Sequence, residues 1–209
     1  MKQKRWNAFV FLLMTALVFC LCSCSGGGGG GHHHPLVPGT IELHNHSAAI
    51  IDHFYLAPVD QTSWGPNILD DLLYPDDFIL IWDIEPDYYD SKITVTGLYS
   101  DYYAYLYDID INPGQDIVLH VYNSSFTGSL EIHNDTVGAY IIGVYVVPAG
   151  APTWGSDQST SDIGPSGQLH LSDFDPGLYD VKIVWDVGPD SNYYDVNIES
   201  LTLTTLNVN

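Results

Sequence analysis

Histidine and carboxylate side chains alternate with apolar residues near the start of the chain, in a pattern that suits a metal ion. Glu42, His44 and His46 are separated by steps of two. Side chains at this step share one face of a β-strand and lie roughly 6.5–7 Å apart, within reach of one Zn²⁺ ion if they lean together. The spacing makes a zinc site a hypothesis to be tested. The favoured interpretation is that these residues form the polar outer face of an edge strand.

The same pattern recurs in the second half of the chain. Glu131, His133 and Asp135 again place carboxylate and imidazole groups at steps of two. Both types of side chain are zinc ligands in proteins. The recurrence turns the zinc site into a hypothesis that can be tested in two places.

Oxygen ligands suited to calcium occur at Asp108, Asp110 and Asn112. They resemble the opening of a calcium-binding loop, but Gly114 comes one position late and Leu119 stands where a glutamate is expected. The intervening isoleucines also fit a strand with both aspartates on its outer face. Calcium at these three residues is therefore a second metal hypothesis.

Signals for catalysis are weak. After residue 24 the chain has no cysteine, no arginine and no Gly-x-Ser-x-Gly motif, so no nucleophile or anion-binding side chain is singled out. Paired carboxylates are common, but a glycosidase needs two of them in one cleft, one with a raised pKa. We expect no enzymatic activity and no catalytic residues, and a hydrolase is the third alternative.

The first residues have the layout of an export signal. Three basic residues lie within the first five positions, and an apolar run over 8–21 leads into Leu21-Cys22-Ser23-Cys24. The end of this run resembles the bacterial lipoprotein signal, with Leu at −3, a small residue at −1 and then the lipidated cysteine. The resemblance implies a signal peptide over 1–23, lipidation of Cys24 (a palmitate-type acyl anchor) and sorting to the outer membrane, which Ser25 fits. An ordinary secretory signal is the alternative.

Residues 24–38 are expected to form a tether, because six glycines at 26–31 and three histidines at 32–34 follow Cys24. Loss of 1–23 would remove Cys20 and Cys22, leaving no disulfide. It would also leave two lysines against 26 acidic residues. Such acidity repels phosphate backbones, which excludes nucleic-acid binding.

The remainder of the chain consists of two related halves. Trp64-Gly65 corresponds to Trp154-Gly155, and Lys92-Ile93 to Lys182-Ile183, at one constant shift. These are the only lysines after residue 5, so chance does not readily explain their equivalent positions. We predict two homologous modules, 39–124 and 128–209.

Both modules are predicted to be β-structure, because β-branched and aromatic runs are separated by Pro, Gly, Asn and Asp. The expected strands are 41–44, 50–57, 78–82, 89–96, 103–111 and 117–122, then 130–133, 140–147, 168–171, 178–185, 193–198 and 201–208. No helical period is sustained after the signal. The fold class is all-β: two tandem small antiparallel β-sandwiches, with immunoglobulin-like topology one option and an open barrel the alternative.

The first module also resembles a known repeat. Ala57-Pro58, Trp64-Gly65-x-Asn67-Ile68-Leu69 and Tyr89-Asp90 are similar to the core of a small, uncharacterised β repeat of exported bacterial proteins. The resemblance is weaker in the second module, where Asp157-Gln158-Ser159 replaces Asn-Ile-Leu. It implies an exported β domain and no assigned activity.

These patterns predict a non-enzymatic, membrane-anchored lipoprotein of the cell envelope with acidic tandem modules. The modules would act as structural or interaction units. Their partners would be the membrane, through the lipid anchor, and an envelope protein or a glycan. The alternative is a protein that binds a divalent cation (Ca²⁺ or Zn²⁺) or a carbohydrate through its acidic loops and tyrosines.

Overall fold

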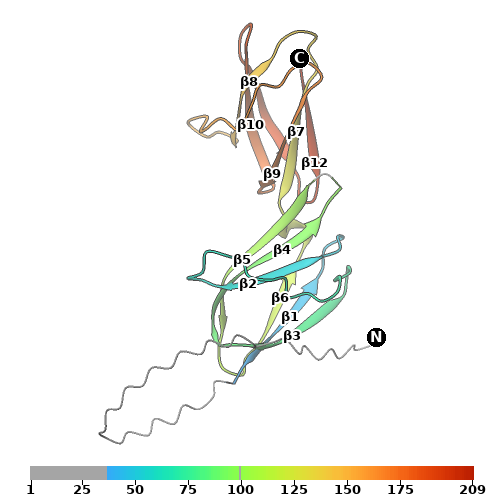
Figure 1. Ribbon diagram of the computed structural model, residues 1–209, viewed down its shortest axis with the longest axis vertical. Coiled ribbons are helices and arrows are strands. Elements are labelled where there is room, and N and C mark those ends of the chain that lie inside the picture. The colour runs from blue at the N-terminus through green and yellow to red at the C-terminus, as the bar shows by residue number, and fades with distance from the viewer. Residues whose placement is uncertain (1–36, 99) are drawn as a thin grey trace, which may run out of the picture.

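Two β-sandwiches form the described part of the chain (Figure 1). The computed structural model describes residues 37–98 and 100–209, so the signal peptide, Cys24 and most of the tether lie outside the described residues. The elements are β1 (Gly39–Asn45), β2 (His53–Pro58), β3 (Phe78–Ile84), β4 (Asp87–Thr96), β5 (Asp101–Ile111), β6 (Asp116–Val121), η1 (Asn123–Ser125), β7 (Gly128–Asn134), β8 (Ile141–Pro148), β9 (Gln168–Phe174), β10 (Gly177–Trp185), β11 (Ser191–Ile198) and β12 (Leu203–Val208). Each expected strand corresponds to one of these strands, and the all-β, tandem-sandwich fold class is confirmed.

Each sandwich packs two three-stranded sheets. The first pairs the sheet β3-β1-β6 with β2-β4-β5, and the second pairs β12-β7-β9 with β11-β10-β8. Neighbouring strands are antiparallel with one exception in each module, because β1 runs parallel to β6 and β7 runs parallel to β12. This pairing of first and last strands puts β1 and β7 in the middle of their sheets. The expectation of an edge strand at Glu42, His44 and His46 is therefore wrong.

Inward-facing side chains form two separate hydrophobic cores. Alternation along β1 buries Ile41 and Leu43, and so turns Glu42 and His44 to the outer face of the sheet. The fully buried side chains of the first core include Ile41, Leu43, Phe54, Ile93 and Val121. Those of the second core include Leu130, Ile132, Val181, Ile183 and Val208.

The internal repeat extends to unusual backbone conformations. Asp108 and Asp195 have φ values of 57° and 55°, in the left-handed region that aspartate tolerates better than most residues. The carboxylate of Asp90 accepts a hydrogen bond from the N–H of Asp108, and Asp180 accepts one from Asp195. Each bond lies beside a shift of register between paired strands. The side chains of the repeated Asp90 and Asp180 thus stabilise the local irregularity in strand pairing, where the register shifts.

The two sandwiches meet end to end through a short buried connection (Figure 1). Phe126 is fully buried in the first core, and Leu201 from the second module packs against that core. The N–H of Thr127 donates to Tyr103 O at 2.8 Å, and Thr127 O accepts from the N–H of Leu201 at 2.9 Å. The connection is therefore held by residues of both modules.

Candidate metal centre

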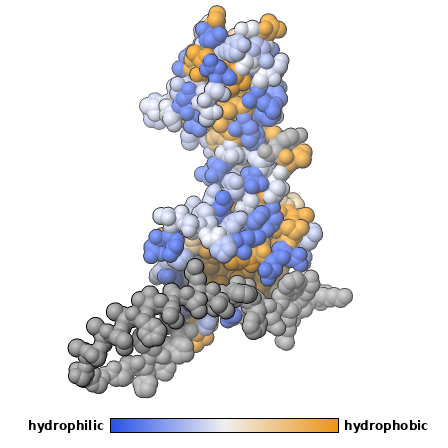
Figure 2. Space-filling model, in the orientation of Figure 1, coloured by the Kyte–Doolittle hydropathy of each residue, from blue (hydrophilic) through white to orange (hydrophobic). Residues whose placement is uncertain are grey.

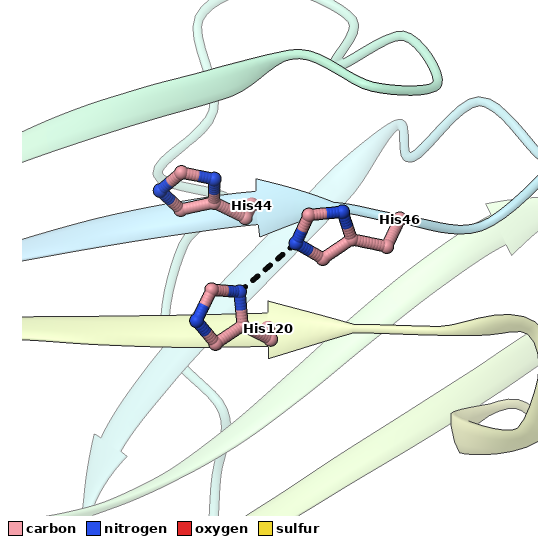
Figure 3. A group of neighbouring side chains, drawn as sticks. All are labelled: His44, His46 and His120. Atoms are coloured by element: carbon pink, nitrogen blue, oxygen red, sulfur yellow. Dashed lines mark hydrogen bonds between the residues drawn. The ribbon is translucent and has the colours of Figure 1, made fainter.

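Three histidines gather on the outer face of the sheet β3-β1-β6 (Figure 3). His44 in β1 lies directly opposite His120 in β6 in the parallel register. His46 follows the end of β1, where its N–H donates to Val121 O at 2.8 Å. One ring nitrogen from each histidine therefore lies within 4.8 Å of the other two.

Hydrogen bonds already orient the three imidazole rings. His46 Nε2 lies 3.0 Å from His120 Nδ1, so one of these nitrogens donates and the other accepts. His44 Nε2 lies 2.6 Å from Glu42 Oε1. In neutral His44 this bond keeps the proton on Nε2 and leaves Nδ1 with a free lone pair. Glu42 thus sets the donor atom that His44 offers to a metal.

Aromatic neighbours frame the cluster. The ring of His44 stacks on Phe78 of β3 with centroids 5.2 Å apart, and His46 stacks on Tyr122 at 5.1 Å. The rings of His46 and His120 are also 5.1 Å apart. His46 and His120 are exposed and His44 is half-buried. An ion can therefore reach the nitrogens directly from solvent.

The second module repeats the frame of this cluster but not its ligands. Glu131 Oε2 lies 2.6 Å from His133 Nε2, which reproduces the carboxylate–imidazole pair. Asp135 and Asn207 occupy the positions of the second and third histidines, since Asn207 lies opposite His133 in the β7–β12 register. Within the described residues, the group of three converging ligands is that of the first module.

The candidate zinc ligands in the structure therefore differ from the set predicted from the sequence, with His120 in place of Glu42. The structure places His44 and His46 together as expected, but it gives Glu42 a contact with His44 in place of a position among the converging ligands. His120 could not be predicted as a ligand from the sequence, because only the parallel β1–β6 pairing brings it next to His44. The one sequence signal is its position on the polar face of the expected strand 117–122.

The residues considered for calcium lie at the end of β5 and in the turn after it. The backbone N–H of Asp108 donates to Asp90 Oδ1 at 3.0 Å, and the Asn112 side-chain amide donates to Gln115 Oε1 at 2.9 Å. Asp108, Asp110 and Asn112 are all exposed. Calcium binding at these residues stays a prediction.

A row of aromatic side chains follows the outer face of β5. The ring centroids of Tyr103 and Tyr105 are 6.2 Å apart, as are those of Tyr105 and Tyr107, and Trp64 lies 6.0 Å from Tyr105. Burial and then the charge of Asp173 raise the pKa of Tyr105 to about 12. The hollow beside Trp64 has a volume of 160 Å³. Small-molecule sites are larger, roughly 300–1,000 Å³. Carbohydrate binding here stays a prediction.

No family profile and no curated protein matches the chain. It is similar to the Bacillus anthracis TIE protein at 14% identity and a TM-score of 0.27, covering 82% of this chain but only 34% of that one. It is also similar to GBS52, the minor pilin of Streptococcus agalactiae (11% identity, TM-score 0.32, 81% of this chain and 94% of that one). A third similar structure is the D295N mutant of the shaft pilin SpaA of Lactobacillus rhamnosus GG (8% identity, TM-score 0.24, 81% of this chain and 98% of that one). At these TM-scores the likeness carries no argument about function.

Within residues 37–98 and 100–209, no helix combines the length and apolar character needed to cross a bilayer.

Proposed function

We propose that the chain is an exported bacterial lipoprotein whose two sandwiches form a stiff, non-enzymatic spacer and interaction unit at the cell envelope. The observation that carries the spacer role is the junction between the sandwiches. Thr127 is hydrogen-bonded to both modules, and Ser100 Oγ lies 2.7 Å from Ser129 Oγ across the junction. Leu201 of the second module also packs against the first core. A connection packed in this way fixes the orientation of one module on the other, whereas a flexible linker leaves it free.

Anchoring through Cys24 is the finer part of this proposal. Its support is the lipoprotein-like sequence of residues 1–24. Each methylene of an acyl chain contributes about 0.8 kcal/mol on burial in a bilayer, so a cysteine with several chains is held without a spanning helix. The glycines at 26–31 would then separate the sandwiches from the bilayer. We place the anchor in the outer membrane.

The surface chemistry supports a role in interaction. Hydrophilic residues cover much of the visible face of both sandwiches (Figure 2). The two lysines after residue 5 are both engaged, because Lys182 Nζ lies 2.8 Å from Asp190 Oδ2 and Lys92 Nζ lies 3.9 Å from the centre of the Tyr103 ring. Acidic copies repel one another, so a basic envelope protein or an uncharged glycan suits this surface better.

Expression of the full chain in a bacterium with an outer membrane tests the anchoring. The wild-type chain should fractionate with the outer membrane, and mass spectrometry should find an acylated peptide beginning at Cys24. Cys24→Ser should abolish the acylation and remove the protein from the outer-membrane fraction. Cys22→Ser is the matched control and should leave acylation unchanged, since bulky Leu21 precedes it. An unacylated wild-type protein would contradict the anchoring.

Cross-linking in intact cells tests the interaction role. The wild-type chain should give reproducible cross-links to an envelope component. If the only cross-links are those also obtained with an unrelated acidic lipoprotein, the interaction role is wrong and the spacer role alone remains.

A further inference from the structure

We infer that His44, His46 and His120 form a binding site for a first-row transition-metal ion, best represented by Zn²⁺. This site is independent of the proposed envelope role. Imidazole nitrogen is a ligand suited to Zn²⁺, Cu²⁺ and Ni²⁺, whereas Ca²⁺ and Mg²⁺ require oxygen. Three histidines with a further position left open form a known type of zinc centre.

The spacing of the nitrogens suits a tetrahedral ion. With Zn–N bonds of about 2.0–2.1 Å, two nitrogens on a tetrahedral ion lie about 3.4 Å apart. His46 Nε2 and His120 Nδ1 are 3.0 Å apart, and all three nitrogens lie within 4.8 Å of one another. Bringing every pair to that spacing takes at most about 1.4 Å of side-chain movement, which ring rotation supplies without backbone change. The ion would replace the proton now shared by His46 and His120.

Glu42 adds the outer support that metal-bound histidines usually have. Such a histidine almost always donates its second ring N–H to a carboxylate, carbonyl or water, and this bond fixes the tautomer. The 2.6 Å contact between His44 Nε2 and Glu42 Oε1 has this form, with Nδ1 left to bind the ion. Glu42 is therefore a positioning residue of the site.

The site is also organised before an ion arrives. His44 is held against Phe78 and His46 against Tyr122, so ion binding restricts few further rotations. Since His46 and His120 are exposed, the fourth position faces solvent and would hold water.

The second module supplies matched controls. It carries Asp135 and Asn207 where the first module has His46 and His120, on the same parallel strand pair. This fold therefore accepts aspartate and asparagine at these positions. His46→Asn, which has the shape of aspartate without its charge, and His120→Asn should leave the sandwich intact. His133→Asn removes a histidine of equal environment from the module that lacks the other two.

Zinc titration of the full chain tests the site. Zn²⁺ affinity is measured by competition with a chromophoric chelator, while circular dichroism checks the fold. The wild type should bind one tightly held ion that His133→Asn retains. Both His46→Asn and His120→Asn should weaken binding roughly 100-fold or more, because each removes one of the three nitrogen ligands. Glu42→Gln should weaken it by about 10–100-fold, as expected for an outer-shell carboxylate.

The histidine tract at 32–34 is identical in all variants, so its contribution is a constant background. Nitrogen NMR of the imidazole rings separates the two sources. Zn²⁺ should shift the ring nitrogens of His44, His46 and His120. Equal affinity of the wild type and His120→Asn, or shifts confined to the tract, would overturn the site.

Discussion

Replacing Asn134 by alanine should destabilise the second sandwich strongly, because its side chain is fully buried and makes four hydrogen bonds. Its Nδ2 donates to Ala139 O and Ile163 O, both at 2.9 Å. Its Oδ1 accepts from the N–H of Thr136 at 3.1 Å and from the Thr136 hydroxyl at 2.7 Å. The side chain thus fastens the β7–β8 loop to the segment that precedes β9.

The magnitude follows from what remains after the substitution. Ala139 O keeps the Thr136 hydroxyl as a donor at 2.9 Å, and Ile163 O keeps the N–H of Ile141 at 3.0 Å. Neither carbonyl is therefore stranded, and the cost is the net value of the lost bonds. At about 0.5–1.5 kcal/mol for each bond, three to four lost bonds amount to about 3 kcal/mol.

Urea and thermal unfolding measure this cost. The measurement uses a chain in which the other four tryptophans are phenylalanine, so that the fluorescence of Trp185, which is 8% exposed in the second core, reports the module concerned. A loss of about 3 kcal/mol should lower its melting temperature by roughly 12–24 °C in a domain of this size. Asn192→Ala, at an exposed position, is the control and should change stability by less than about 0.5 kcal/mol. A loss below about 1 kcal/mol for Asn134→Ala would refute this reasoning.

Two further predictions concern pH. Burial opposes the charged form of Asp157, but hydrogen bonds led by the Val144 N–H outweigh it and hold the pKa below its ordinary value of 3.8. The stability that this carboxylate provides is present above pH 3.8 and is lost as the pH falls further. In Asp157→Asn the melting temperature should therefore fall less on acidification than in the wild type. An equal fall in both proteins would contradict this. Burial and the charge of Asp173 raise the pKa of Tyr105 from 10.0 to about 12, so the unfolded chain releases this proton first and stability falls as the pH rises through that window. Tyr105→Phe should reduce the loss of stability at alkaline pH. It should also remove the tyrosine ionisation that occurs at the highest pH in an absorbance titration, and persistence of that ionisation would assign it to another residue.

Strand positions could be predicted because their signals are local. The alternation that buries Ile41 and Leu43 is present in five consecutive residues, and turn residues mark the end of each run. The internal repeat could be predicted for a similar reason, since Trp64-Gly65 and Lys92 have counterparts that require no structure to recognise.

The full metal cluster could not be predicted because it depends on long-range pairing. His44 lies on the first strand of the first module and His120 on its last strand, far apart in the sequence. No local pattern shows that these two strands are neighbours and run parallel. The role of Glu42 also depends on side-chain geometry, since a carboxylate at this spacing suits a ligand and a positioning group equally. Similarly, Asn134 is visible in the sequence only as a repeated residue, because its partner Ile163 O comes from a distant segment.

The stiff junction between the sandwiches is tested most directly by measuring the distance between two spin labels, one in each module, by pulsed electron–electron double resonance. Spin labels are placed at Val118→Cys in β6 and Thr205→Cys in β12, both exposed strand positions, in a chain whose three native cysteines are serine. A single narrow distance distribution is expected, and insertion of Gly-Gly-Ser before Thr127 should broaden it. A broad distribution without the insertion would contradict a fixed orientation and remove the basis of the spacer role.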